Sequence, residues 1–442
     1  MQASILAFMT LGVILWLTLG KFQPLLLLLL CAMIAMVAAG MRGGRAAGIG
    51  ARFTPAQLLS VAAFFGVGML ALQPQLIYAE EVIPYYTLRA LLGLLTLWTG
   101  VGLVQATSDP EGERGTRMLI AGTLTLLFVQ ALVVFASPHP LIDVFVTNSA
   151  GVDFVLQGNN PYAMTYPDVY RGAYDFIPGF GYPPGALWLL VPFRLLGDVR
   201  LASIGANVAS VVLLLWLMRR AGHSTRTGWI ACLAWLALPI SLFVLEQAWV
   251  DPILVPFILG LMLAVSTRRW VAAGALLAAL IGIKQYAVLL VLPSAVFAWR
   301  LGGRAALFRA TGATAIVLVL LIAPFALLDG DALYHQLAGT LFQRELRNDS
   351  LSIPAFIINA LGRELPGAFL AAVTVASAIG FSAWLARKEH VDEHDWLSAI
   401  VMTFAITFLF GKQAFCNYYY LLAALLFARA LVAPIEPAGR TS

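Results

Sequence analysis

The residues of this chain that could do chemistry gather in one polar stretch, residues 137–184. It contains one lysine or arginine, Arg171, and four aspartates: Asp143, Asp153, Asp168 and Asp175. Long apolar segments precede and follow it, so the stretch is expected to form a loop against a membrane face. Because folding does not require carboxylates at such a place, the loop is the first candidate for a functional site.

Asp143 is the leading candidate for a general base. It follows Pro138 and Pro140, which are expected to end the preceding helix, and its apolar neighbours should partly desolvate the carboxylate. The residues alone leave two alternatives open. Asp143 could instead cap a helix over residues 144–156, and Asp153 could instead be the base.

A second set of candidates is cationic. Lys284 lies in the middle of an apolar run over residues 270–299, which is too long for one span and predicts a tight hairpin of two short helices with its tip at Lys284. A lysine there costs about 2.5–3.5 kcal/mol to insert and usually faces a cavity and a partner. An anionic ligand is the expected partner, and replacing Lys284 with Met is expected to leave folding nearly intact.

Three further cations are predicted on the same side of the membrane, Arg344, Arg347 and Lys412. With Lys284 they would form a site for a lipid phosphate. The alternative is a scatter of cations that merely snorkel to the membrane surface.

Polar residues suited to sugar hydroxyls form a third set. Glu246, Gln247 and Asp251 cluster at the boundary of two apolar runs, where the alternative is a polar hairpin tip. Asn160 and Tyr182 join them from QGNNPY and GYPPG, which are sequences typical of turns. The three cysteines have no CxxC or histidine spacing, so no disulfide framework or zinc site is predicted.

The elements that must position these residues are membrane helices. Of the 442 residues, 61% are hydrophobic and 11% charged, whereas soluble domains have roughly 25% charged residues. The apolar runs predict an all-α polytopic membrane protein with a bundle of about 12 to 14 transmembrane helices, and residues 185–196 predict an interfacial helix. Arginines in short links place both termini in the cytoplasm, so the net charge of +5 reflects orientation and not a nucleic-acid partner.

The predicted organisation has two parts. Residues 1–108 form an appended four-helix membrane scaffold, and residues 109–442 form the functional module. Within that module, two extracytoplasmic loops, residues 137–199 and 326–365, are expected to form the active site.

The order of several motifs resembles the GT-C superfamily of membrane glycosyltransferases. The motifs are IDVF, GNNPY, YPPGALWLLVPF, EQAWVDPILV, GALLAALIGIKQYAVLLVLP and RNDSLS, spread over residues 117–430. The chain is most similar to the bacterial polyprenyl-phosphate-mannose-dependent α-mannosyltransferases. That resemblance implies an all-helical membrane bundle, an aspartate base that matches Asp143, and a lipid monophosphate sugar as donor. His335 in DALYHQL resembles a late-loop histidine of the same family.

The resemblance and the residues together predict a plasma-membrane hexosyltransferase. It would transfer a hexose, expected to be mannose, from a polyprenyl phosphate to an extracytoplasmic glycan or glycolipid, with inversion. No cofactor is expected, and the first loop lacks the DxD pair that would support a metal requirement. The alternative is a transporter or flippase of a lipid-linked sugar, which should show internal repeats, and the sequence shows none.

Overall fold

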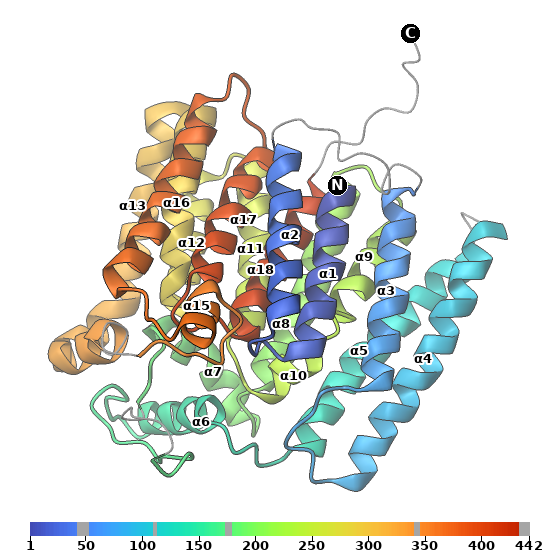
Figure 1. The fold of residues 1–442 in the computed structure, drawn as a ribbon, viewed down its shortest axis with the longest axis horizontal. Helices are drawn as coiled ribbons and strands as arrows, with labels where there is room; N and C mark the ends of the chain where they lie inside the picture. Colours follow the sequence, from blue (N-terminus) through green and yellow to red (C-terminus); the bar gives the residue numbers. More distant parts are fainter. Residues whose placement is uncertain (42–52, 109–112, 173–178, 340–344, 433–442) are drawn as a thin grey trace.

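The computed structural model describes residues 1–41, 53–108, 113–172, 179–339 and 345–432. These residues form helices and connecting loops, and none of them belongs to a β-strand. Most helices run side by side in an upright bundle, while α6 (Asp143–Leu156) lies across its lower end (Figure 1).

The first part of the chain contains α1 (Gln2–Thr18), α2 (Pro24–Met41), α3 (Pro55–Leu72), α4 (Val82–Ser108), α5 (Glu113–Ala136), α7 (Pro184–Leu195), α8 (Leu201–Arg220) and α9 (Thr225–Leu236). The second part contains α10 (Ser241–Glu246), α11 (Asp251–Ser266), α12 (Trp270–Ile283), the 3₁₀ helix η2 (Gln285–Leu290), α13 (Val291–Tyr334), the π-helical turn η3 (His335–Gly339), α15 (Ile353–Leu361), α16 (Gly367–Arg387), α17 (Glu393–Leu409) and α18 (Cys416–Leu431).

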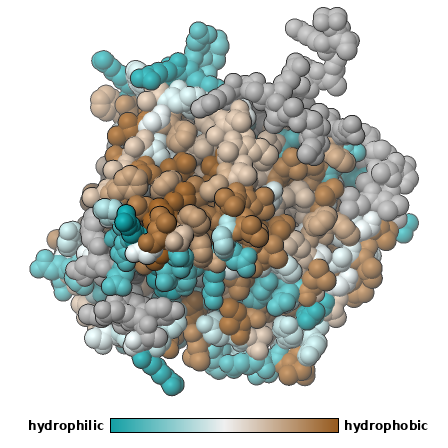
Figure 2. Space-filling view, viewed as in Figure 1, coloured by the Kyte–Doolittle hydropathy of each residue, from teal (hydrophilic) through white to brown (hydrophobic). Residues whose placement is uncertain are grey.

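The bundle has the composition of a membrane protein. Six helical segments of the described chain are long and apolar enough to cross a membrane: α2, α3, α5, α8, α16 and the run Gln285–Gly339. Shorter apolar helices accompany them, among them α1, α11, α12 and α18. Apolar residues dominate the middle of the surface, and hydrophilic residues gather toward its upper and lower ends (Figure 2). The expectation of a polytopic all-helical membrane protein is confirmed, and the count of 12 to 14 spans stays a prediction.

The predicted break at Lys284 is confirmed. Helix α12 ends at Ile283, and Lys284 has an extended backbone with φ −149° and ψ 124°. The chain then continues through η2 into α13, which is itself interrupted at Gly303 (φ 66°) and Asp329 (φ −162°). An apolar run of uniform composition is therefore divided by backbone geometry into separate helices.

Hydropathy alone predicts a single span for the apolar run over residues 229–248, and this prediction is wrong. The structure divides the run into α9 and α10 around Pro239. Proline has no N–H for an intrahelical bond, which favours a break at this point. The break packs closely on α3, because a Cβ on Gly66 would lie only 2.1 Å from the carbonyl oxygen of Ala237.

Loops distant in the sequence meet at the lower end of the bundle. In the α1–α2 turn, the N–H of Phe22 donates to the carbonyl oxygen of Asp349 at 2.9 Å. The N–H of Leu351 donates to the carbonyl oxygen of Ala414, in the α17–α18 loop, at 3.2 Å. At the opposite end, Arg429 Nη1 at the end of α18 donates to Ser4 Oγ in α1 at 2.6 Å. The start of α1 and the end of α18 therefore lie together at this end of the bundle.

The N-terminal helices share the core of the bundle. Helix α1 packs on α18, α2 on α17, and α3 on α9, and the rings of Phe8 and Phe427 lie 5.0 Å apart. The predicted scaffold of residues 1–108 thus contributes to the same hydrophobic core as the rest of the chain, while its standing as a separate module stays a prediction.

Candidate active site

The two long polar loops contact each other, because a Cβ on Gly179 in the first loop would lie only 2.2 Å from Gln336 Oε1 in the second. The ring of Tyr162, in the first loop, lies 5.5 Å from that of Phe325 near the end of α13. The first loop also rests on the Lys284 break, because Gln285 Nε2 donates to Gly181 O at 2.9 Å. A Cβ on Gly185 would lie 2.6 Å from the carbonyl oxygen of Gly282, so only a glycine permits this approach of α7 to α12.

Asp143 is the first residue of α6, and the N-cap position belongs to Ile142. The alternative that Asp143 caps this helix is therefore wrong. The helix dipole still stabilises a carboxylate in the first turn. Its Oδ1 accepts from the backbone N–H of Val144 at 2.9 Å and from the hydroxyl of Tyr170 at 3.1 Å. Among the described residues, Oδ2 has no hydrogen-bond partner. The Asp143 side chain is partly buried, and its carboxylate is oriented through one oxygen.

Tyr170 was not among the residues predicted from sequence. Burial, and next to it the charge of Asp143, raises the pKa of the Tyr170 hydroxyl. The phenol therefore remains a neutral donor to the carboxylate near neutral pH. Only its place among polar loop residues could have pointed to it, since 27 residues separate it from Asp143.

Asp153, the alternative base, is engaged with α7. Both of its oxygens accept from the guanidinium of Arg194 at 2.8 Å, in a bidentate pair that joins α6 to α7. This arrangement occupies the carboxylate and favours Asp143 as the base.

Glu246 lies at the centre of a buried network. Its carboxylate is fully buried and accepts from the N–H groups of Ile77 and Tyr78, at 2.8 and 2.9 Å, and from Ser137 Oγ at 2.6 Å. A fourth donor is Gln247 Nε2 at 3.2 Å. Because a carboxylate offers about four acceptor positions, this geometry supports a structural role for Glu246 and Gln247 and gives no support to the predicted contact with sugar hydroxyls.

Lys284 and Asp251 form a buried ion pair. The Nζ of Lys284 lies 2.6 Å from Asp251 Oδ2, and both side chains are almost fully enclosed. The hydroxyl of Tyr286 donates to the other oxygen, Oδ1. The anion nearest to Lys284 is therefore a protein carboxylate, and removal of the lysine alone would leave a buried charge without its partner. The expectation that Lys284→Met leaves folding nearly intact is corrected on this ground.

Aromatic rings enclose the same ammonium group. Its Nζ lies 4.8 Å from the ring centre of Tyr286, 5.4 Å from that of Tyr418 and 5.5 Å from that of Tyr182. Tyr182, predicted as a sugar contact, thus lies against the Lys284 break. Its carbonyl oxygen accepts from the Tyr162 hydroxyl at 2.8 Å.

Two of the predicted phosphate-binding cations come from neighbouring segments. Arg347 N donates to Lys412 O at 2.9 Å, so the second loop and the α17–α18 loop run together here. The Arg347 guanidinium binds Asp349 at 2.8 Å and lies 5.0 Å from the centre of the Phe415 ring. Lys412 is partly exposed.

The remaining candidates are less constrained. His335 is exposed at the start of η3, and Arg344 lies outside the described residues. Asn160 Oδ1 accepts from Tyr162 N at 3.1 Å, as in an Asx turn. Its Nδ2 is buried and has no partner within the described parts of the chain.

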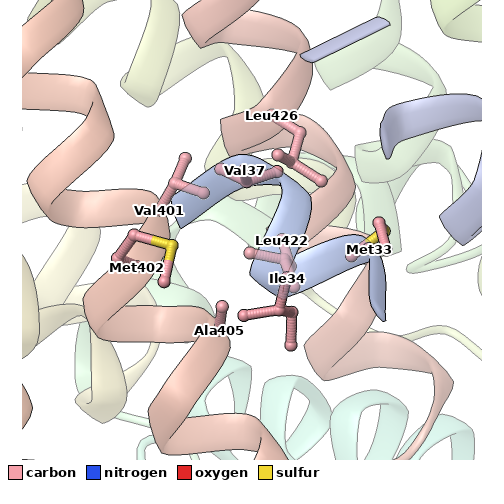
Figure 3. A pocket seen from close by; sticks show the side chains of 8 residues that line it. All are labelled: Met33, Ile34, Val37, Val401, Met402, Ala405, Leu422 and Leu426. Carbon is pink, nitrogen blue, oxygen red and sulfur yellow. The ribbon is translucent and has the colours of Figure 1, made fainter. Parts of the chain in front are cut away.

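Two other features lie away from this end. The described residues contain one group of three side chains with metal-ligand spacing, Asp392, His394 and Asp395. It occupies the loop end opposite the polar loops, where Lys388 pairs with Asp395. A small hollow between α2, α17 and α18 is lined only by apolar side chains (Figure 3), which offer no hydrogen bonds to a sugar.

Comparison with known proteins identifies the family. The model of glycosyltransferase family 87 matches residues 180–411, which is slightly more than half of the chain. The match contains the Lys284 break and the whole range of the second loop, whereas Asp143 precedes it. A search of curated proteins gave no match. The expected GT-C superfamily is confirmed, and the chain belongs to glycosyltransferase family 87, a family of GT-C type membrane glycosyltransferases.

Proposed function

We propose that this glycosyltransferase moves a hexose, mannose in the first instance, from a polyprenyl phosphate to the hydroxyl of a glycan or glycolipid. The family supplies the reaction class, and the motif resemblance supplies the donor. Membrane lipid would surround the polyprenyl chain, and the reaction would take place on the extracytoplasmic side of the plasma membrane.

The observation that carries the proposal is the state of Asp143. Its carboxylate is fixed through Oδ1 by Val144 and Tyr170, while Oδ2 has no partner among the described residues. A base needs this combination of fixed orientation and free acceptor capacity. Asp153, ten residues later on α6, has both oxygens bound to Arg194.

The proposed step is one displacement. Oδ2 of Asp143 takes the proton of the acceptor hydroxyl, whose oxygen forms a bond to the anomeric carbon. The bond from that carbon to the phosphate oxygen breaks, and the polyprenyl phosphate leaves with the electron pair. Attack opposite the leaving group inverts the configuration, and one base is enough because cations stabilise the phosphate.

Arg347 and Lys412 are the cations best arranged to bind that phosphate, with Arg344 and His335 as further candidates. They belong to adjacent loop segments, and the pair that Arg347 forms with Asp349 is partly exposed. Lys284 is already neutralised by Asp251, so it would reach a phosphate only if that pair rearranged.

The test uses purified enzyme, polyprenyl-phosphate mannose with a radiolabelled sugar, and a membrane glycolipid extract as acceptor. Asp143→Asn should bind the donor as the wild type does and transfer the sugar at least about a hundredfold more slowly. Asp153→Asn is the matched control and should lose much less. Full transfer by Asp143→Asn would overturn the assignment of the base, and transfer from a nucleotide sugar in place of the lipid donor would overturn the donor class.

A further inference from the structure

Arg200, the residue before α8, lies fully buried at the point where α5 ends and α6 begins. Its Nη1 donates to the carbonyl oxygen of Ser137 at 2.7 Å, and Nη2 donates to that of Val134 at 3.3 Å. Val134 lies in the last turn of α5 and Ser137 directly follows the helix, where backbone acceptors lack intrahelical partners. One guanidinium therefore fixes the end of the helix from which the Asp143 segment departs.

The same guanidinium also contacts α6. Its Cζ lies 4.9 Å from the centre of the Phe145 ring, two residues after Asp143. Asp198 completes the arrangement, because its carboxylate accepts from Arg200 Nε at 3.0 Å and Nη2 at 2.6 Å. Arg200 thus contacts the chain six residues before Asp143 and again two residues after it.

Ser137 is held from a second side. Its hydroxyl donates to Glu246 at 2.6 Å while its carbonyl accepts from Arg200. The carbonyl oxygen of Ala136, next to it, accepts from the N–H groups of Glu80 and Glu81 at 2.9 and 3.1 Å. The turn between α5 and α6 is therefore held at the end of α5, through Ala136 and Ser137, and at the first turn of α6, through Phe145.

We propose that Arg200, oriented by Asp198, is a positioning residue that sets the location of the Asp143 carboxylate. The proposal rests on the proposed function, in which Asp143 is the base. Only a planar, forked cation can bind two backbone carbonyls and a carboxylate while it stacks on a ring. A displacement of about 1 Å in a reacting group can cost about a hundredfold in rate, so loss of the fork should affect the chemical step and leave donor binding almost unchanged.

The first experiment compares Arg200→Lys with Arg194→Lys in the transfer assay. Both substitutions keep the charge and remove the fork, but Arg194 binds the non-catalytic Asp153. Arg200→Lys should lower kcat by about tenfold or more, since its single ammonium cannot replace all the bonds, and the KM for the donor should stay within about twofold. Arg194→Lys should leave kcat within about twofold.

A double-mutant cycle separates positioning from general stability. If Arg200 acts through Asp143, Arg200→Lys should have little further effect on the residual rate of Asp143→Asn, so the two losses should not add. Losses that multiply, or a folded Arg200→Lys with the wild-type kcat, would overturn the proposal. If instead Asp143→Asn alone keeps full transfer, the base assignment has failed, which is a different result.

A second variant covers the case in which Arg200→Lys does not fold. Phe145→Leu keeps an apolar side chain and removes the ring face that the Arg200 guanidinium contacts. It should lower kcat about threefold or more, with an unchanged KM for the donor and, in the Asp143→Asn background, no added loss. An unchanged kcat in folded Phe145→Leu would also contradict the proposal.

Discussion

The hydroxyl of Tyr170 donates to Oδ1 of Asp143 at 3.1 Å, across 27 residues of chain. This contact joins the far part of the first loop to the start of α6, and it occupies the same oxygen that binds the backbone N–H of Val144. The two donors leave the second carboxylate oxygen for the acceptor substrate in the proposed reaction.

Removal of this contact should slow transfer. Tyr170→Phe deletes one hydrogen bond to a charged group, worth about 1.5–3 kcal/mol, and part of that loss should appear as a kcat about tenfold lower, with an unchanged KM for the donor. Tyr86→Phe, at an exposed tyrosine, is the control and should match the wild type. An unaltered kcat in Tyr170→Phe would show that the bond does not orient the base.

The pH dependence of the same tyrosine follows from its environment. Burial and the Asp143 charge raise its pKa above the ordinary value of about 10. The unfolded chain therefore loses this proton first, and the stabilising contribution is present below about pH 10 and is lost as pH rises further. The absorbance of tyrosinate, compared between the wild type and Tyr170→Phe, should show no ionisation of Tyr170 up to about pH 10, whereas ionisation below that pH would contradict this assignment.

Glu246 should prove to be structural. Glu246→Gln replaces one acceptor oxygen with an NH₂ group that faces buried N–H donors, so the free energy of unfolding should fall by about 2–3 kcal/mol, seen as a lower thermal midpoint in detergent. Glu113→Gln removes an exposed pair with Arg117 and should change stability little. Normal stability combined with weaker binding of the acceptor would instead restore the predicted sugar contact.

Replacing both members of the Lys284–Asp251 pair should destabilise the protein less than replacing either one alone. Lys284→Met or Asp251→Asn alone leaves a buried charge unpaired and should destabilise the protein by about 3–5 kcal/mol. The double variant should recover much of the thermal midpoint and keep the donor affinity. If the double variant is stable but binds the donor at least tenfold more weakly, Lys284 does contact the phosphate.

Arg347 should contribute to donor binding. Arg347→Ala should raise the KM for the polyprenyl donor several-fold, and the difference from the wild type should shrink as salt increases, because the side chain is partly exposed. Arg363→Ala, at an exposed position of the same loop, is the matched control. Equal KM values for the two variants would remove Arg347 from the phosphate site.

The orientation in the membrane is open to cysteine labelling. In a variant without Cys31, Cys232 and Cys416, cysteines at the exposed positions Gln157 and Asn348 should react with an impermeant thiol reagent from outside the cell. A cysteine at Ser224, at the other end of the bundle, should not react. Labelling of Ser224 from outside would reverse the predicted topology.

The sequence by itself determined that the chain is an all-helical membrane protein and where some of its helices begin and end. Hydropathy alone predicts a span over residues 55–72, where the structure has α3, and the lysine inside a long apolar run predicts the break at Lys284. Hydropathy and turn residues are local signals, because they depend on the solvent that each segment meets. The motifs are also local stretches of sequence, so their order along the chain was enough to indicate the GT-C superfamily.

Only the tertiary structure decided which polar groups pair. Lys284 binds Asp251, 33 residues away, and Glu246 accepts from Tyr78 across 168 residues. Helices that are apolar on almost every side carry little information about which face meets which neighbour. The cost of burying a charge makes a partner necessary but does not name it. Among the described residues, packing left Oδ2 of Asp143 without a hydrogen-bond partner and enclosed the carboxylates of Glu246 and Asp251.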